Sequence, residues 1–176
     1  DQIHIKNFGH ILDEIRIALE AESAHMEVDF PYFIEKRAPV TGSSGLMEYR
    51  CSLMGMVGKR REFKVRVKVP VQTLCPCSKE ISDYGAHNQR GLVTAVVRYE
   101  RFFWIEDLIE LIEGCASSPV YPILKRPDEK YVTEYAFEHP MFVEDVVRLA
   151  AASLSSKSEF SWFSVEAENY ESIHNH

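Results

Sequence analysis

The chain has 176 residues, enough to bury one hydrophobic core or two small modules that share a sheet. Its net charge of −7, without a dominant basic face, argues against a nucleic-acid-binding surface. No apolar run reaches the ~20 residues that a membrane-spanning helix needs, and the four cysteines form no regular disulfide framework, so we expect a cytoplasmic protein with reduced thiols.

The first half of the chain is predicted to form one helix followed by strands. Residues 7–20 repeat apolar side chains at helical spacing. Three segments then alternate apolar and polar residues as strands do: residues 26–34, 47–57 and 63–71. Pro31 interrupts the first of them, which favours an edge strand or a bend. Residues 58–61 separate the other two and predict an antiparallel hairpin.

The second half is predicted to contain mostly helices. Strands are expected at residues 92–99 and 160–167, and helices at residues 105–112, 128–137 and 140–154. Pro140 is expected in the first turn of the last helix, where a missing N–H costs nothing. This order of elements predicts an α+β fold with an antiparallel sheet and helices packed on one face.

One short stretch, LCPCSKEISDYGAHNQRG, is the most informative part of the sequence. It places Cys75, Cys77 and His87 directly after a predicted strand. Thiolate and imidazole are strong zinc donors, but a closed structural site would need a second cysteine pair, and Cys51 and Cys115 are isolated. The pattern therefore favours a catalytic metal site whose other ligands come from elsewhere in the chain. Spacing alone leaves inert cysteines beside a surface histidine as an equal alternative.

Further polar residues downstream are candidates with ordinary alternatives. Acidic and imidazole side chains that could join the site are Glu129, Glu144, Glu171, His174 and His176. Glu129 could instead be a carboxylate favoured at a helix start, and Glu144 could belong to a solvated helix face. The other three could simply belong to a frayed C-terminal tail. Cationic side chains that could hold phosphate, or simply be solvated, are Lys79, Arg90, Lys125 and Arg126.

Four segments taken together resemble a known enzyme family. PVQTLCPCSKEISDYGAHNQRG, LKRPDEKYVTE, FVEDVVR and VEAENYESIHNH occur in the order found in GTP cyclohydrolase I of type IB, and the resemblance runs from about Pro39 to the C-terminus. It implies conversion of GTP and water to 7,8-dihydroneopterin triphosphate and formate, the first step of tetrahydrofolate and pterin biosynthesis. It also implies a tunnelling fold (T-fold), with tandem modules in each subunit of a homotetramer and active sites at subunit interfaces.

The resemblance also implies roles for individual residues. Cys75 is expected to be the catalytic thiolate that binds one divalent metal per active site, which would be Zn, Mn or Fe(II). The positions that match other groups near the metal, not all binding at once, are His87, Glu129, Glu171 and His174. His174 and His176 are expected to transfer protons. Glu144 is expected to anchor the guanine, with Cys77, Lys79, Lys125 and Arg126 as further substrate-binding residues.

The domain prediction follows from the same resemblance. Residues 1–176 are expected to comprise two fused T-fold modules. The N-terminal module, about residues 1–57, is expected to be incomplete because the family's chains are longer at the N-terminus, and the catalytic motifs fall in about residues 58–176. Two alternatives remain: a T-fold nitrile reductase that uses Cys75 as nucleophile with a nicotinamide cofactor, and a non-catalytic zinc-binding domain.

Overall fold

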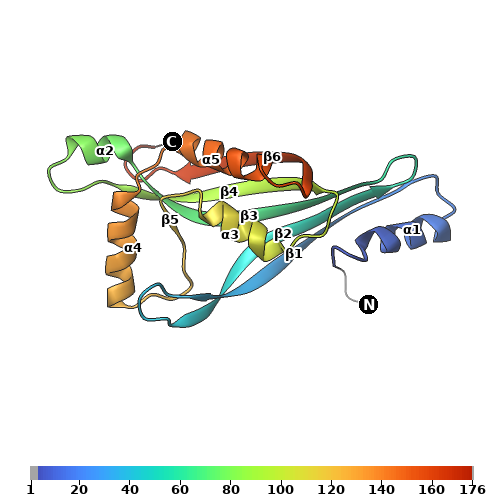
Figure 1. Ribbon diagram of the computed structural model, residues 1–176, viewed down its shortest axis with the longest axis horizontal. Coiled ribbons are helices and arrows are strands. Elements are labelled where there is room, and N and C mark those ends of the chain that lie inside the picture. Colours follow the sequence, from blue (N-terminus) through green and yellow to red (C-terminus); the bar gives the residue numbers. More distant parts are fainter. Residues whose placement is uncertain (1–3, 176) are drawn as a thin grey trace.

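The computed structural model describes residues 4–175, which form a six-stranded antiparallel sheet with helices (Figure 1). In chain order the elements are α1 (Phe8–Ala18), β1 (Ala24–Arg37), β2 (Ser44–Val57), β3 (Glu62–Leu74), α2 (Pro76–Ile81), β4 (Asn88–Tyr99), α3 (Ile105–Glu113), β5 (Ser118–Pro119), α4 (Arg126–Glu138), α5 (Val143–Ser155) and β6 (Phe160–Tyr170). The predicted α+β class is confirmed.

The sheet follows the order β1-β2-β3-β4-β6, and the short β5 pairs with β3. Consequently β1 and β6 are the two edges of the main sheet. Pro31 lies in the edge strand β1, as predicted, because an edge strand tolerates a missing N–H on its open side. The hairpin predicted at residues 58–61 is confirmed, since β2 and β3 pair antiparallel on either side of it.

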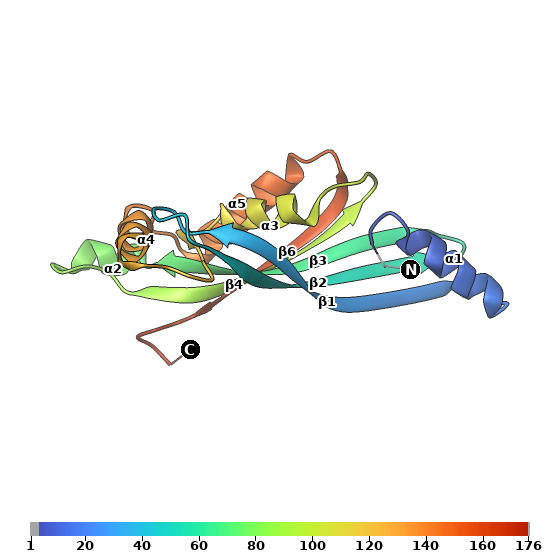
Figure 2. The same cartoon turned by 90° about the horizontal axis from the view of Figure 1, so that it is seen from below.

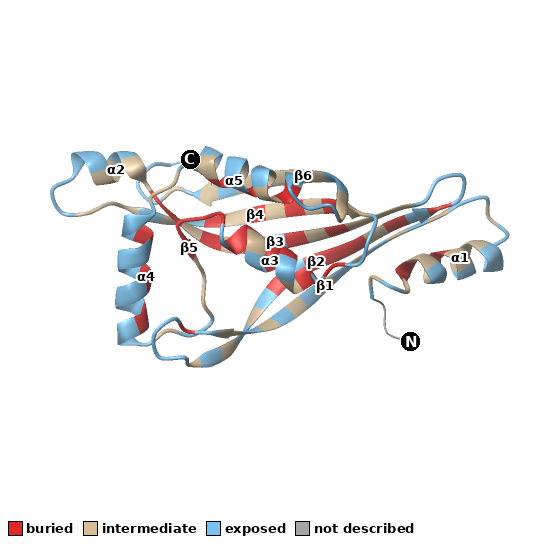
Figure 3. Cartoon of the chain, viewed as in Figure 1, coloured by how far each residue is buried: buried red, intermediate tan, exposed pale blue. Residues whose placement is uncertain are grey.

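The core lies between one face of the sheet and the helices α3 and α5 (Figure 2). Alternate residues of the central strands are fully buried there, including Val65, Val67, Val93 and Val97. Figure 3 shows that burial is concentrated along β2, β3 and β4 and on the inner sides of these helices. Helix α1 packs on the same face: a Cβ added to Gly55 in β2 would lie 2.6 Å from the Leu12 side chain.

Three local features differ from the sequence-based prediction. Helix α5 begins at Val143, so Pro140 precedes the helix instead of occupying its first turn. The helix starts later because the Asp145 carboxylate accepts the N–H of Phe142, which caps it there. The sequence analysis missed α2 and β5, because six and two residues are too short to show a period.

Helix α4 lies beyond the end of the sheet and is fixed there by Asp128 (Figure 1). This fully buried carboxylate accepts the backbone N–H groups of Val40, Thr41 and Lys125, each at 2.9 Å, and the Thr41 hydroxyl at 2.7 Å. Burial opposes ionisation of Asp128, but these hydrogen bonds outweigh it and hold its pKa well below the usual range. Asp128 therefore ties the start of α4 to the turn between β1 and β2.

No helix within residues 4–175 combines the length and apolar character needed to cross a bilayer.

Candidate active site at one end of the sheet

Cys75 lies where β3 ends and α2 begins. It is the N-cap residue of α2, and its Sγ accepts the backbone N–H of Ser78 at 3.4 Å. Pro76 occupies the first helical position, where its fixed φ favours the turn out of the strand. The Cys75 side chain is half-buried, whereas Cys77, two residues further on, is exposed. The two cysteines of the CPC motif therefore have different surroundings.

His87 lies next to Cys75, at the end of the loop that connects α2 with β4. The Cys75 N–H donates to the His87 carbonyl oxygen at 3.1 Å, and the His87 N–H donates to the Ser78 hydroxyl at 3.2 Å. Leu74 and Asn88 are the last pair of the ladder between β3 and β4, so the two candidate ligands directly follow and precede paired residues. The sheet thus determines how Cys75 and His87 approach each other.

Glu171 reaches His87 from the end of β6. Its Oε1 atom lies 3.4 Å from His87 Nδ1, and these side chains are only 19% and 14% exposed. The hydroxyl of Ser172 lies 3.1 Å from the same imidazole nitrogen. Hydrogen bonds from the N–H groups of Ile173 and Ser172, together with the nearby His87 and His174, lower the pKa of Glu171. Glu171 is therefore an ionised acceptor beside an imidazole at neutral pH.

The two C-terminal histidines follow Glu171 closely. His174 lies in the segment after β6 and contributes to the electrostatic environment of Glu171. His176 falls outside the described residues, so its predicted role stays a prediction.

Two helices are anchored to the same end of the sheet. The Met141 N–H donates to the Leu74 carbonyl at 3.0 Å, which places the start of α5 beside the residue that precedes Cys75. Glu144 is exposed in the first turn of α5, three residues beyond Met141. Lys79 in α2 donates to the carbonyl oxygen of Phe137 near the end of α4, and its ammonium lies 4.3 Å from the centre of the Phe137 ring.

A cleft of about 630 Å³ lies between α4 and the loop that leads to His87. It is lined by Leu74, Asp83, Tyr84, Gly85, Ala86, Asn88, Thr133 and Phe137. Its volume is within the range of about 300–1,000 Å³ that small-molecule sites occupy. The cleft adjoins the backbone that carries Cys75 and His87, so a ligand bound there would contact the edge of the candidate site.

Three predicted residues lie elsewhere. Lys125, the N-cap residue of α4, and Arg126 and Glu129 in its first turn are exposed and lie close to the β1–β2 turn. Phe137, which contacts Lys79, lies eight residues after Glu129 along α4, a distance of about 12 Å at a rise of about 1.5 Å per residue. Within the chain described, α4 therefore separates these residues from the Cys75 end by a large part of its length.

The donor set suits a divalent metal in its chemistry. A thiolate, an imidazole and a carboxylate are the ligand types that Zn²⁺, Mn²⁺ and Fe²⁺ accept between them. Within residues 4–175, however, no three Cys, His, Asp or Glu side chains are close enough together to hold a metal ion. The described chain brings His87 and Glu171 together and holds Cys75 next to them through the backbone.

One contributor to this site was not singled out from the sequence. Ser78 donates its N–H to Cys75 Sγ and accepts the His87 N–H with its hydroxyl, so it holds both candidate ligands. The available signal was a small hydroxyl residue three positions after a cysteine that precedes a proline, a pattern that fits a capped helix start.

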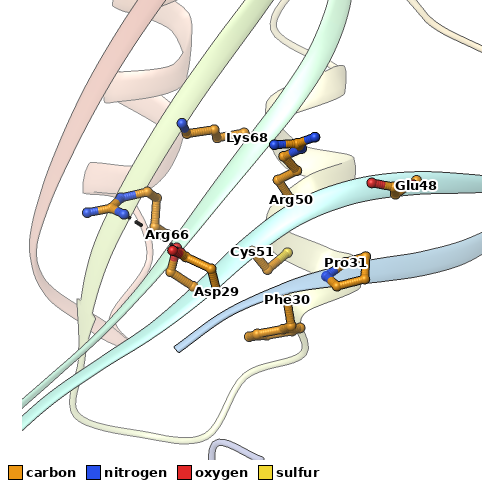
Figure 4. A pocket seen from close by; sticks show the side chains of 9 residues that line it. Asp29, Phe30, Pro31, Glu48, Arg50, Cys51, Arg66 and Lys68 are labelled. Carbon is orange, nitrogen blue, oxygen red and sulfur yellow. Dashed lines mark hydrogen bonds between the residues drawn. The ribbon is translucent and has the colours of Figure 1, made fainter. Parts of the chain in front are cut away.

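A separate hollow of about 380 Å³ lies on β1, β2 and β3 (Figure 4). Here Arg66 contacts Glu27 at 2.7 Å, the Ser52 hydroxyl donates to Asp29, and Arg50 lies directly opposite Lys68 on the neighbouring strand. The residues that line this hollow include none of those predicted for the site.

The sequence was then compared with known proteins. A family model described as type I GTP cyclohydrolase folE2 matches residues 1–176. Proteins named GTP cyclohydrolase FolE2 from Geobacter sulfurreducens, Geotalea uraniireducens and Syntrophus aciditrophicus are 57%, 56% and 58% identical to the chain. These alignments cover 100%, 100% and 99% of the chain, and 68%, 65% and 69% of the respective relatives. The chain thus spans about two thirds of the length of these relatives.

Proposed function

Since this chain belongs to the type I GTP cyclohydrolase FolE2 family, it is an enzyme of the GTP cyclohydrolase class, and we propose that the Cys75 end of its sheet carries the reaction. The reaction proposed is hydrolysis of GTP to 7,8-dihydroneopterin triphosphate and formate, the first step of tetrahydrofolate and pterin biosynthesis. The observation that supports this location is that His87 is hydrogen-bonded through its carbonyl to Cys75 and lies 3.4 Å from Glu171, which belongs to a motif far away in the sequence.

We further propose that one divalent metal per site, Zn, Mn or Fe(II), binds here. Cys75, His87, Glu171 and His174 are the proposed donors. The chemistry that such a metal would supply when bound is Lewis acidity, which would lower the pKa of water so that hydroxide could form near neutral pH and attack the purine C8. Glu129 is proposed to reach the site from a neighbouring subunit, because α4 holds it away from Cys75 in its own chain.

The chain's own residues have separate proposed tasks. Glu171, whose pKa is lowered by the N–H groups that it binds, lies 3.4 Å from His87 Nδ1 and is proposed to orient the imidazole. His174 and His176 are proposed to carry protons during ring opening and loss of formate. Glu144, exposed at the start of α5, is proposed to accept the N–H groups of guanine.

The triphosphate is proposed to contact Lys79, Lys125 and Arg126, and Cys77 is proposed as a further substrate-binding residue. Lys79 is already at the Cys75 end, so it would exchange the Phe137 carbonyl for a phosphate oxygen. Lys125 and Arg126, like Glu129, lie at the far end of α4 and would act across a subunit interface.

The proposed assembly is a cytoplasmic homotetramer of type IB T-fold subunits with tandem modules and active sites at subunit interfaces. Two observations support an assembly. The strands β1 and β6 are the edges of the main sheet, so each has a row of backbone groups available for another chain. The proposed ligands and phosphate-binding residues also fall at two separate places in one chain.

The experiment is formate release from GTP by the full-length protein, first stripped with a chelator and then given Zn²⁺ or Mn²⁺. Metal-dependent recovery by a protein that stays folded without metal is the expected result. A protein that unfolds on chelation and releases no formate would instead be a structural zinc domain. Absence of formate with every metal, from a folded oligomer, would contradict the proposal and lead to a test of nitrile reduction with a reduced nicotinamide.

A further inference from the structure

A side chain from β6 crosses the neighbouring strand to reach β3. Asn169 in β6 lies opposite Gly91 in β4, and Gly91 lies opposite Val71 in β3. The Asn169 amide Nδ2 nevertheless donates to the hydroxyl of Thr73 in β3, at 3.0 Å. Adjacent strands are about 4.8 Å apart, so this bond connects two strands that do not pair with each other.

Gly91 is what makes the crossing possible. A Cβ at this position would lie 2.6 Å from Asn169 Oδ1 and 3.1 Å from Val71 Cγ2. Glycine inside a strand weakens the strand, and it often marks a place where another group approaches the backbone closely. Here the group that approaches is the Asn169 amide, so Gly91, Asn169 and Thr73 form one unit, which we call the strand clasp.

The strand clasp lies just before the candidate ligands on both segments. Thr73 is fully buried and precedes Cys75 by two residues. Asn169 precedes Glu171 by two residues, and the pairing of β4 with β6 ends at Tyr170. Beyond the clasp, the Glu171 side chain contacts His87 and accepts the backbone N–H groups of Ser172 and Ile173. The last cross-strand side-chain bond before the site is therefore the one between Asn169 and Thr73.

We propose that Asn169 and Thr73 are positioning residues that set the distance between the Cys75 and Glu171 segments, with Gly91 providing the space between them. This inference rests on the proposed function, because it assigns the clasp to the same metal site. It adds residues outside the predicted donor and substrate-binding set. A misplacement of one segment relative to the other would move Glu171 and His174 away from Cys75 while leaving the core intact.

The test uses four variants of the full-length protein. Asn169→Leu and Thr73→Val remove the bond while keeping the number and branching of the side-chain heavy atoms, whereas Thr73→Ser keeps the hydroxyl. Ser161→Ala is the matched control, because it removes the 2.9 Å bond from Arg98 Nε at the opposite end of the same β4–β6 pair. All four are compared with the wild type by thermal melting, which reports general loss of stability.

The first readout is Co²⁺ affinity, followed through the absorption band that a thiolate–Co²⁺ bond produces. Asn169→Leu and Thr73→Val are expected to bind Co²⁺ about 10–100-fold more weakly, the usual effect of losing a group that orients ligands. Thr73→Ser and Ser161→Ala should match the wild type. A fifth variant that combines Asn169→Leu with Thr73→Val should bind Co²⁺ no more weakly than either single variant, because both substitutions remove the same bond.

The second readout needs no metal. Amide hydrogen exchange of residues 171–175 in the metal-free protein should accelerate in Asn169→Leu and Thr73→Val, and should be unchanged in Thr73→Ser and Ser161→Ala. Unchanged exchange and Co²⁺ affinity in the first two variants would overturn the clasp. If Co²⁺ affinity and exchange protection fall in all variants in proportion to the fall in melting temperature, the clasp is a structural contact and has no positioning role. If the wild type itself gives no thiolate band, the proposed metal site fails, and the exchange data alone decide on the clasp.

Discussion

The two ends of the sheet are held together by different interactions. At the end where β3 begins and β4 stops, aromatic rings pack in series: Phe63 with Tyr99, Tyr99 with Phe103 at 5.6 Å, and Phe103 with Phe160 at 5.0 Å. At the opposite end hydrogen bonds take their place, among them Cys75 to His87 and Asn169 to Thr73. Ring packing stabilises without directing polar groups, whereas hydrogen bonds orient them. We therefore expect the aromatic end to contribute mainly stability, and the end proposed to carry the chemistry to depend on oriented polar groups.

The largest expected difference concerns the four thiols. In the native metal-free protein, Cys77 and then Cys75 should react with a thiol reagent at pH 8, while Cys51 and Cys115 react slower by a factor on the order of 10³, because they need local unfolding. Burial also raises the pKa of Cys51 to about 12, so little thiolate forms there. Mass spectrometry of labelled peptides gives the order.

Repeating the thiol labelling with Zn²⁺ tests which of the two accessible cysteines binds metal. Added Zn²⁺ should protect Cys75 and leave Cys77 reactive if only Cys75 is a ligand. Equal reactivity of all four thiols would contradict the expected difference in accessibility between the core cysteines and those at the Cys75 end.

Shortening an aromatic side chain at the end where β3 begins should lower stability without changing activity. Phe103→Ala is expected to lower the free energy of unfolding by about 3–5 kcal/mol, since Phe103 is buried between two rings. Formate release per folded molecule should not change. Phe102→Ala is the matched control, because Phe102 is 42% exposed and should cost much less. Urea unfolding measures both, and a selective loss of activity in Phe103→Ala would contradict the division between the ends.

Alkaline pH should weaken the core gradually. Burial raises the pKa of Cys51 from 9.0, and that of Tyr99 from 10.0, to about 12 in each case. Between the ordinary value and about 12, the unfolded chain loses protons that the folded chain keeps, so stability falls as pH rises. The slope should reach about 1 kcal/mol per pH unit for each group. Urea unfolding at pH 8, 9.5 and 10.5 checks this, and Cys51→Val should flatten the first part of the decline.

The sequence predicted the fold where a residue pattern repeats. The alternation from Phe63 to Val71 and the helical spacing from Ile105 to Ile112 both match the structure, because one face of each element is buried. Helix α2 was missed because a helix of six residues, fewer than two turns, is too short to show a repeat. Pro140 was misplaced because proline fits both before and inside a first turn, and the hydrogen bond from the Phe142 N–H to Asp145 decides where the helix starts.

The candidate site was only partly visible in the sequence. Cys75 and His87 stand close together along the chain, so their pairing could be expected from spacing. The approach of Glu171 depends on the register of β6 against β4, which no local pattern specifies, and it entered the prediction only through the family resemblance. Asn169 was missed for the same reason: within β6 it reads as one more polar residue in an alternating strand.

The central claim is that the Cys75 end of the sheet carries the reaction. Its most direct test is formate release from GTP by the wild type and by Cys75→Ala, per mole of folded protein, with saturating Zn²⁺ or Mn²⁺. The variant is predicted to lose activity by a factor on the order of 10³ or more while keeping the melting temperature of the metal-free wild type. Formate release by Cys75→Ala within a few-fold of the wild type would contradict the claim.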